Sequence, residues 1–158
     1  QVVRRQRQMC IRDSLKIVLE TIISSKEEQN NLIDKLLNEF NISHIRNNMG
    51  AGLSGGERRR VEICRTLALK PDFVLLDEPF AGVDPIAVED IQQMIISLKQ
   101  QNIGVLITDH NVRETLSITD RSYLLHGGKI LKSGDAQTLA SDEEVRRIYL
   151  GKNFKLDQ

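Results

Sequence analysis

The sequence predicts an α/β fold in which a parallel sheet is flanked by helices, and three observations support this class. From residue 73 onward, short apolar runs alternate with helical patterns, which is typical of right-handed crossovers between parallel strands. Residues 73–76 are continuously apolar, as expected of a central strand buried on both faces. Before this strand, apolar residues recur at helical spacing, so a helical segment should precede the sheet.

Three helices are predicted before the first strand. Residues 15–24 carry apolar side chains at helical spacing. Ser25 is a suitable N-cap for the next helix, with Glu28 three residues later. That helix presents an apolar face made of Leu32, Ile33, Leu36, Leu37 and Phe40. Residues 47–52 have the composition of a loop, and a third helix should run from 56 to about 69, ended by Lys70-Pro71.

The remainder is predicted to alternate strand and helix and to close with a hairpin. The expected elements of this part are strand 73–76, helix 86–100, strand 105–108 and helix 111–117. Residues 121–125 and 129–132 should form a hairpin that turns at Gly127-Gly128. Helices at 136–140 and 142–150 then close the domain, and residues 151–158 form a polar tail.

Composition places the chain among soluble globular domains. Its 158 residues suffice for one domain, and 40% hydrophobic and 28% charged residues are ordinary values for this class. The formal net charge is zero, so no global field favours nucleic acid as a partner. No signal peptide is visible, and the apolar runs are too short to span a bilayer. Cys10 and Cys64 suit a reducing cytosol, and Cys64 is expected to be a small buried apolar residue.

The first fourteen residues are expected to be foreign to the domain. Residues 8–14 (QMCIRDS) resemble a translation of an adapter used in transposon-based sequencing libraries. Residues 1–14 are therefore interpreted as an artefact that lies outside the fold. The alternative is a genuine N-terminal tail that is disordered, as polar termini often are.

Ser54-Gly55-Gly56-Glu57 has the features of a phosphate site. Two adjacent glycines leave backbone N–H groups uncovered where a helix starts, and that end of a helix carries partial positive charge. The serine hydroxyl adds a donor. The alternative is a helix start capped by Ser54. For the following residues 58–60, all arginine, a solvated helix face with Arg58 paired to Glu62 is favoured over an anion patch.

Asp77 and Glu78 follow the predicted strand, at the edge of an open α/β sheet where ligands bind. Because adjacent carboxylates in an apolar setting repel each other, a nearby cation or reacting water would explain them. The alternative is an Asp-Glu-Pro turn at a strand end. Asp84 is a suitable N-cap for a helix with Pro85 in first position.

Of the three histidines, His110 follows the predicted strand 105–108 after one residue and lies 32 residues after Glu78. A lone histidine after a strand is usually unremarkable, so its role depends on the resemblance described next. His44 and His126 are expected to be ordinary surface or turn residues.

Three segments together resemble motifs of the ATPases of ABC transporters. Residues 53–57 (LSGGE) resemble the signature motif, residues 73–79 (FVLLDEP) the Walker B strand, and residues 81–85 (AGVDP) the D-loop. The resemblance implies a P-loop NTPase-like nucleotide-binding domain. Residues 15–52 would be part of its helical subdomain and residues 53–150 the C-terminal part of its core.

The domain is expected to be truncated at its N-terminus. The sequence contains no Gly-x-x-x-x-Gly-Lys-Ser/Thr loop. The adenine-stacking aromatic residue, the glutamine loop and the first half of the domain are absent with it. The chain by itself should therefore neither bind ATP tightly nor hydrolyse it. Exposed sheet edges and apolar surface should make it prone to aggregate.

The resemblance also implies roles, with ATP and Mg²⁺ as cofactors. Asp77 would organise Mg²⁺ through water, Glu78 would be the general base, and His110 would be the switch histidine that contacts the γ-phosphate. A homodimer would hold ATP as a sandwich, in which Ser54, Gly55, Gly56 and Glu57 meet the nucleotide of the partner subunit. Asp84, in the D-loop, would lie where the two subunits meet.

Within the family, longer strings resemble the ATPase subunits of lipopolysaccharide export: residues 53–63, 76–86 and 104–115. Glu57 stands where glutamine is common in the wider family, a substitution that suits this group. The resemblance implies integral membrane subunits as partners and a location on the cytoplasmic face of the inner membrane. One alternative is an ATPase of a branched-chain amino-acid importer. Another is a non-catalytic module that docks its signature half-site onto an intact ATPase.

Overall fold

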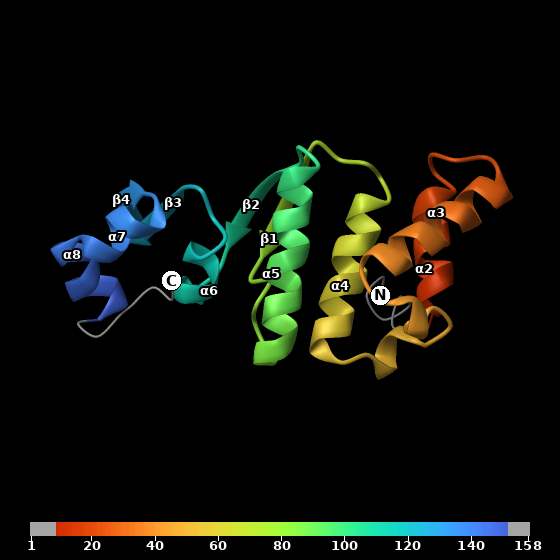
Figure 1. Ribbon diagram of the computed structural model, residues 1–158, viewed down its shortest axis with the longest axis horizontal. Helices are drawn as coiled ribbons and strands as arrows, with labels where there is room; N and C mark the ends of the chain where they lie inside the picture. The colour runs from red at the N-terminus through yellow and green to blue at the C-terminus, as the bar shows by residue number, and fades with distance from the viewer. Residues whose placement is uncertain (1–8, 152–158) are drawn as a thin grey trace.

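The computed structural model describes residues 9–151, and its elements follow one another along an elongated molecule (Figure 1). In chain order, the elements are α2 (Ile11–Leu19), α3 (Lys26–Glu39), the 3-10 helices η1 (Ser43–Ile45) and η2 (Gly50–Gly52), α4 (Gly55–Leu67), β1 (Phe73–Asp77), α5 (Pro85–Gln100), β2 (Gly104–Thr108), α6 (Val112–Leu116), β3 (Ser122–His126), β4 (Lys129–Gly134), α7 (Ala136–Ser141), α8 (Glu143–Val145) and the π-helical turn η3 (Arg146–Leu150). Helices α2 and α3 lie at one end, and β3 and β4 with α7 and α8 lie at the other. Strands β1 and β2 and helices α4 and α5 form the middle.

Helix α2 differs from its prediction at both ends, because it begins at Ile11 rather than residue 15 and ends at Leu19 rather than residue 24. The Ile11 side chain is only 3% exposed. The Ile11 backbone N–H donates to the carbonyl of Asn48 at 3.1 Å, which joins the helix start to the loop before α4. Residues 11–14 are thus packed rather than disordered. Residues 1–8 lie outside the described part, and the foreign origin of residues 1–14 stays a prediction.

The beginning of α3 is confirmed. Ser25 is the N-cap, and its hydroxyl accepts a hydrogen bond from the backbone N–H of Glu28 at 3.3 Å. Helix α4 begins at Gly55 and ends at Leu67, two residues before the predicted end.

Strands β1 and β2 pair in parallel, as predicted, with Phe73 opposite Gly104 and Asp77 opposite Thr108. A Cβ at position 104 would lie 2.3 Å from the Phe73 ring, so the exposed ring would have to turn away to admit a larger residue. The prediction that β1 is buried on both faces is wrong. Val74 is 1% exposed, but Phe73 and Leu75, which face the other way, are 73% and 74% exposed.

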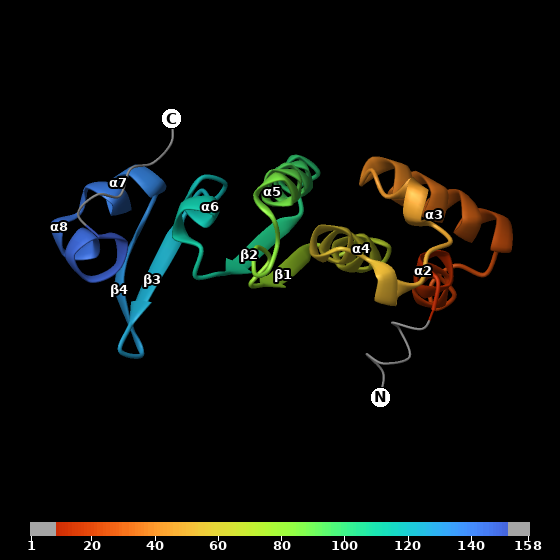
Figure 2. The same ribbon diagram turned by 90° about the horizontal axis from the view of Figure 1, so that it is seen from below.

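The exposed face of β1 follows from the layering of the described residues. Helix α5 covers one side of β1 and β2, and no described helix covers the other (Figure 2). On that uncovered side Leu106 of β2 is 59% exposed. The predicted exposure of apolar sheet surface is thereby confirmed, while aggregation stays a prediction.

The C-terminal hairpin β3–β4 is antiparallel and turns at Gly127 and Gly128, as predicted. Both glycines have positive φ, 56° and 76°, which suits a tight two-residue turn. Downstream, the single helix predicted over 142–150 is instead α8 followed by η3. Of the predicted polar tail, residues 152–158 lie outside the described part.

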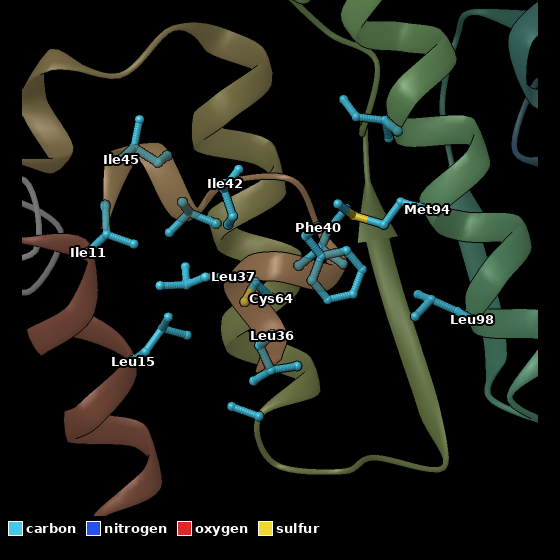
Figure 3. Close-up of a cluster of buried hydrophobic side chains, with 14 of the residues drawn as sticks. Ile11, Leu15, Leu36, Leu37, Phe40, Ile42, Ile45, Cys64, Met94 and Leu98 are labelled. Atoms are coloured by element: carbon cyan, nitrogen blue, oxygen red, sulfur yellow. The ribbon is translucent and has the colours of Figure 1, made fainter. Parts of the chain in front are cut away.

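Two hydrophobic cores hold these elements together. The larger joins α2, α3, α4, β1 and α5 and includes Cys64, which is fully buried as expected (Figure 3). Burial raises the pKa of the Cys64 thiol to about 12. The smaller core lies under the hairpin and is made of Leu116, Leu124, Leu139 and Val145. None of the helices between residues 9 and 151 is both long and apolar enough to cross a membrane.

Candidate functional site

The signature segment forms a closed capping box at the start of α4. The Ser54 hydroxyl accepts from the Glu57 backbone N–H at 3.2 Å, and the Glu57 carboxylate accepts from the Ser54 backbone N–H at 2.8 Å. The alternative of a capped helix start is thus realised.

Glu57 is held as a carboxylate. Hydrogen bonds from the backbone and hydroxyl of Ser54 lower its pKa, with a smaller contribution from His44. The His44 Nε2 atom lies 3.3 Å from a Glu57 carboxylate oxygen. His44 is exposed, as expected of a surface residue, and makes this one contact with the signature segment. No sequence pattern links the two residues, since the contact depends on how η1 is placed beside α4.

The two signature glycines also allow close packing within the chain. A Cβ on Gly55 would lie 2.9 Å from the Gly82 carbonyl oxygen, and a Cβ on Gly56 would lie 2.5 Å from the Ala87 Cβ. Asp84 is the N-cap of α5, as predicted, and accepts from the Ala87 N–H at 3.0 Å. The signature segment thus lies directly against the predicted D-loop of the same chain.

The arginines after the glycines are not a uniform solvated face. Arg59 donates to the Glu78 backbone carbonyl at 2.9 Å and pairs with Glu62 at 3.0 Å. The predicted partner of Glu62 was Arg58, so this prediction is wrong by one position. Arg60 lies 3.4 Å from the Asp90 carboxylate. Helix α4 is thereby tied both to the end of β1 and to α5.

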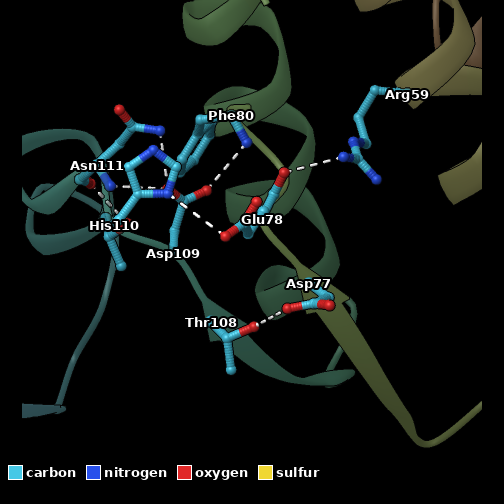
Figure 4. A network of polar contacts seen from close by, with 9 residues as sticks. Arg59, Asp77, Glu78, Phe80, Thr108, Asp109, His110 and Asn111 are labelled. Atoms are coloured by element: carbon cyan, nitrogen blue, oxygen red, sulfur yellow. Dashed lines mark hydrogen bonds and ion pairs between the residues drawn. The ribbon is translucent and has the colours of Figure 1, made fainter. Parts of the chain in front are cut away.

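The carboxylates predicted to be catalytic and metal-organising lie at the carboxyl end of β1, beside the carboxyl end of β2 (Figure 4). Asp77 accepts a hydrogen bond from the Thr108 hydroxyl, while Glu78 points toward His110. Both carboxylates are exposed, so the expectation of an apolar setting is wrong in the described part.

Glu78 adopts an unusual backbone conformation. Its φ is 46°, in the left-handed region, which is strained for a residue with a side chain. Its backbone N–H still donates to the Thr108 carbonyl at 2.7 Å, so the chain leaves the sheet at this residue. The turn aims the carboxylate at the loop after β2, where His110 Nδ1 lies 3.5 Å from Glu78 Oε1. Two predicted site residues are thus brought together.

A third acidic residue, Asp109, was not among the predicted site residues. Its side chain is fully buried and accepts from the Phe80 backbone N–H at 3.1 Å. A carboxylate directly after a strand is the signal that could have pointed to it. His126, by contrast, is exposed at the hairpin end, as expected of a turn residue.

Among residues 9–151, no group of three or more His, Cys, Asp or Glu side chains could hold a metal by itself. The donor set at Asp77 is one exposed carboxylate, a hard oxygen ligand of the kind Mg²⁺ takes. Mg²⁺ commonly keeps several waters and binds through one or two carboxylates and substrate phosphates. Asp77 therefore fits a magnesium ion that arrives with a nucleotide, and does not fit an ion held by protein alone.

The family model described as ABC transporter matches residues 1–81. The lipopolysaccharide export system ATP-binding protein LptB of Haemophilus influenzae is 52% identical over 95% of this chain, which covers 63% of that protein. LptB of Escherichia coli K12 is 49% identical with the same coverage. A probable ABC transporter ATP-binding protein of Azorhizobium caulinodans is 51% identical, and this chain covers 53% of it. The chain thus spans less than two thirds of the length of these relatives.

Solved structures support the fold class. The ADP conformation of MJ1267, an ATP-binding cassette of an ABC transporter, matches with a TM-score of 0.78 at 27% identity, covering 94% of this chain and 65% of that one. A nucleotide-free ATP-binding cassette from an ABC transporter matches with a TM-score of 0.80 at 26% identity, covering 94% and 66%. The predicted α/β class of P-loop NTPase type is confirmed.

Proposed function

Because this chain belongs to the ABC transporter family, we propose that it carries the signature motif, general base and switch histidine of an ATP-hydrolysing transporter subunit. The observation that carries the proposal is the contact between Glu78 and His110. Their side chains come from the ends of two paired strands and approach to 3.5 Å. The strained backbone at Glu78, which aims its carboxylate at His110, supports a functional role for this turn.

In the proposed reaction, Glu78 accepts a proton from the attacking water as general base. Its carboxylate is 57% exposed and so within reach of a water molecule. The same carboxylate faces His110 Nδ1, which would orient the imidazole and leave Nε2 to accept a hydrogen bond from the attacking water. Asp77 would hold Mg²⁺ through water, and that ion supplies charge neutralisation on the phosphates when bound.

The second half of the proposed site is the start of α4. Ser54 and Gly55 are exposed, and the first turn of α4 offers backbone N–H groups and the positive end of the helix. We assign Ser54, Gly55, Gly56 and Glu57 to the γ-phosphate of ATP held by a partner subunit. This gives a homodimer with ATP sandwiched between subunits, in which Asp84 of the D-loop lies at the boundary.

The proposed cargo is lipopolysaccharide, on the strength of the named relatives. Two relatives at 49–52% identity are named as lipopolysaccharide export ATP-binding proteins. The subunit would then bind integral membrane partners on the cytoplasmic face of the inner membrane. A branched-chain amino-acid importer is the alternative within the family.

By itself, a chain of this sequence is proposed to bind ATP weakly and not to hydrolyse it. Its residues include no glycine loop with lysine and serine or threonine, which would cradle the phosphates. Such a chain would instead act as a signature half-site that associates with a complete ATPase when nucleotide is bound.

A complementation experiment tests the cargo. Residues 15–151 would replace the equivalent segment of E. coli LptB, and the hybrid would be expressed in cells depleted of their own LptB. We expect the hybrid to restore growth and outer-membrane lipopolysaccharide, and its Glu78→Gln variant to fail. A hybrid that is expressed and hydrolyses ATP but restores neither would contradict lipopolysaccharide export and favour the importer alternative.

A further inference from the structure

We propose that Asp109 is a positioning residue that fixes the switch histidine and the start of the D-loop segment as one unit. The inference rests on the proposed function, because it concerns how His110 is held for hydrolysis. Asp109 lies between Thr108, the last residue of β2, and His110. Its burial and its hydrogen bonds distinguish Asp109 from an ordinary residue at a strand end.

The Asp109 side chain is fully buried, and its two oxygens have different partners (Figure 4). Oδ2 accepts from the Phe80 backbone N–H at 3.1 Å. Oδ1 accepts from the Asn111 backbone N–H at 2.7 Å and from the Asn111 side-chain amide at 2.8 Å. Burying a carboxylate is costly unless hydrogen bonds compensate, and these three donors are what makes the burial tolerable.

These bonds join two loops that carry the proposed chemistry. Phe80 directly follows Glu78 and Pro79 and leads into the D-loop, whereas Asn111 follows His110 and stands at the N-cap position of α6. Asp109 therefore couples the backbone on the far side of Glu78 to the backbone on both sides of His110. A shift of either loop would break bonds to a buried charge, so the two loops should move together.

Asp109 also bears on the tautomer of His110. His110 Nδ1 faces two carboxylates, with Asp109 Oδ1 at 3.8 Å and Glu78 Oε1 at 3.5 Å. Negative charge on this side favours a proton on Nδ1 in the neutral ring, which leaves Nε2 unprotonated. Asp109 is therefore proposed to act on His110 in two ways: its hydrogen bonds hold the loop in place, and its charge favours the Nδ1–H tautomer.

The test uses the whole 158-residue chain without nucleotide, so that its result does not depend on hydrolysis. Long-range ¹H–¹⁵N correlation spectra at about pH 9, above the usual range of histidine titration, report the tautomer of each imidazole. Hydrogen exchange reports the protection of the Phe80 and Asn111 amides. In the wild-type chain we expect His110 in the Nδ1–H form and both amides protected.

Asp109→Asn preserves shape but places an amide donor where one donor points at Oδ2 or two donors converge on Oδ1. We expect the Phe80 or Asn111 amide to exchange at least about tenfold faster, as for a lost charged hydrogen bond, and His110 to shift toward the Nε2–H form. Asp120→Asn is the matched control, because it removes a carboxylate that is 74% exposed. It should change neither the amide exchange nor the His110 tautomer.

Two results would overturn the proposal. One is a wild-type chain whose Phe80 and Asn111 amides exchange as fast as free loops, which needs no variant. The other is a folded Asp109→Asn chain with unchanged exchange and an unchanged His110 tautomer. Neither result would bear on whether Glu78 is the general base, so the two proposals fail separately.

Discussion

A Cβ atom on Gly56 would lie 2.5 Å from the Cβ of Ala87, so the first turn of α4 packs against the first turn of α5 without room for a methyl group. Gly56→Ala should therefore overpack this contact and lower the free energy of unfolding by about 1–3 kcal/mol. Urea denaturation followed by circular dichroism measures the change.

Gly52→Ala is the matched control for this prediction, because a Cβ on Gly52 meets nothing within 4 Å. Its effect should stay within about 0.5 kcal/mol, as for other surface substitutions. Equal effects of the two substitutions would contradict the packing role assigned to Gly56.

The carboxylate of Glu57 predicts a pH dependence of stability. Hydrogen bonds from Ser54 lower the pKa of Glu57 below 4.5 in the folded chain. The folded state therefore gains stability from this group above pH 4.5, and loses it as the pH falls through the lower, folded pKa. We expect Glu57→Gln to reduce the fall in unfolding free energy between about pH 6 and pH 3.5.

Urea denaturation at a series of pH values measures the free energy of unfolding of the wild-type chain and of Glu57→Gln. The difference between the two free energies removes the contribution of other carboxylates. Asp135 and Asp142 also have lowered pKa values and contribute equally to both chains. Parallel pH profiles for the wild-type chain and Glu57→Gln would show that the capping box does not hold Glu57 ionised.

The two cysteines should differ in reactivity. Cys64 is fully buried, and burial raises its pKa to about 12, so it should not react with a thiol reagent while the chain is folded. Cys10 is partly exposed and should react slowly, since burial raises its pKa as well. Labelling with a chromogenic disulfide should give one thiol in buffer and two in denaturant. Fast labelling of both in buffer would mean that the core around Cys64 is not formed.

Nucleotide binding by the unaltered chain offers a fourth prediction. Calorimetric titration with Mg-ATP should give no dissociation constant in the micromolar range, because the sequence supplies no glycine loop for the phosphates. Titration of buffer alone into the folded chain is the control. Micromolar binding would show that other residues capture the phosphates.

Local patterns predicted most of the elements. The N-caps Ser25, Ser54 and Asp84 were found because their side chains bond within three residues of themselves. The parallel pairing of β1 and β2 followed from the strand–helix–strand order. Boundaries were less accurate, as at Ile11, where contacts with the distant loop near Asn48 extend the helix.

The site contacts that could not be predicted from the sequence join residues that are far apart in the chain. The bond from Arg59 to the Glu78 carbonyl spans 19 positions, and that from Phe80 to Asp109 spans 29. The exposure of Phe73 and Leu75 runs against the sequence pattern, because a continuous apolar run is typical of a strand covered on both faces, whereas no described helix covers this face. The family resemblance, by contrast, implied roles for Glu78 and His110 in one reaction, and their side chains lie 3.5 Å apart.

The central claim is that Glu78 acts as general base beside His110, and the steady-state ATPase rate of the purified LptB hybrid tests it most directly. Glu78→Gln should lower kcat at least about 100-fold with little change in KM, since it removes only proton transfer. Glu89→Gln, an exposed carboxylate on α5, is the control and should leave the rate unchanged. A Glu78→Gln hybrid that hydrolyses ATP at the unsubstituted rate would contradict the account.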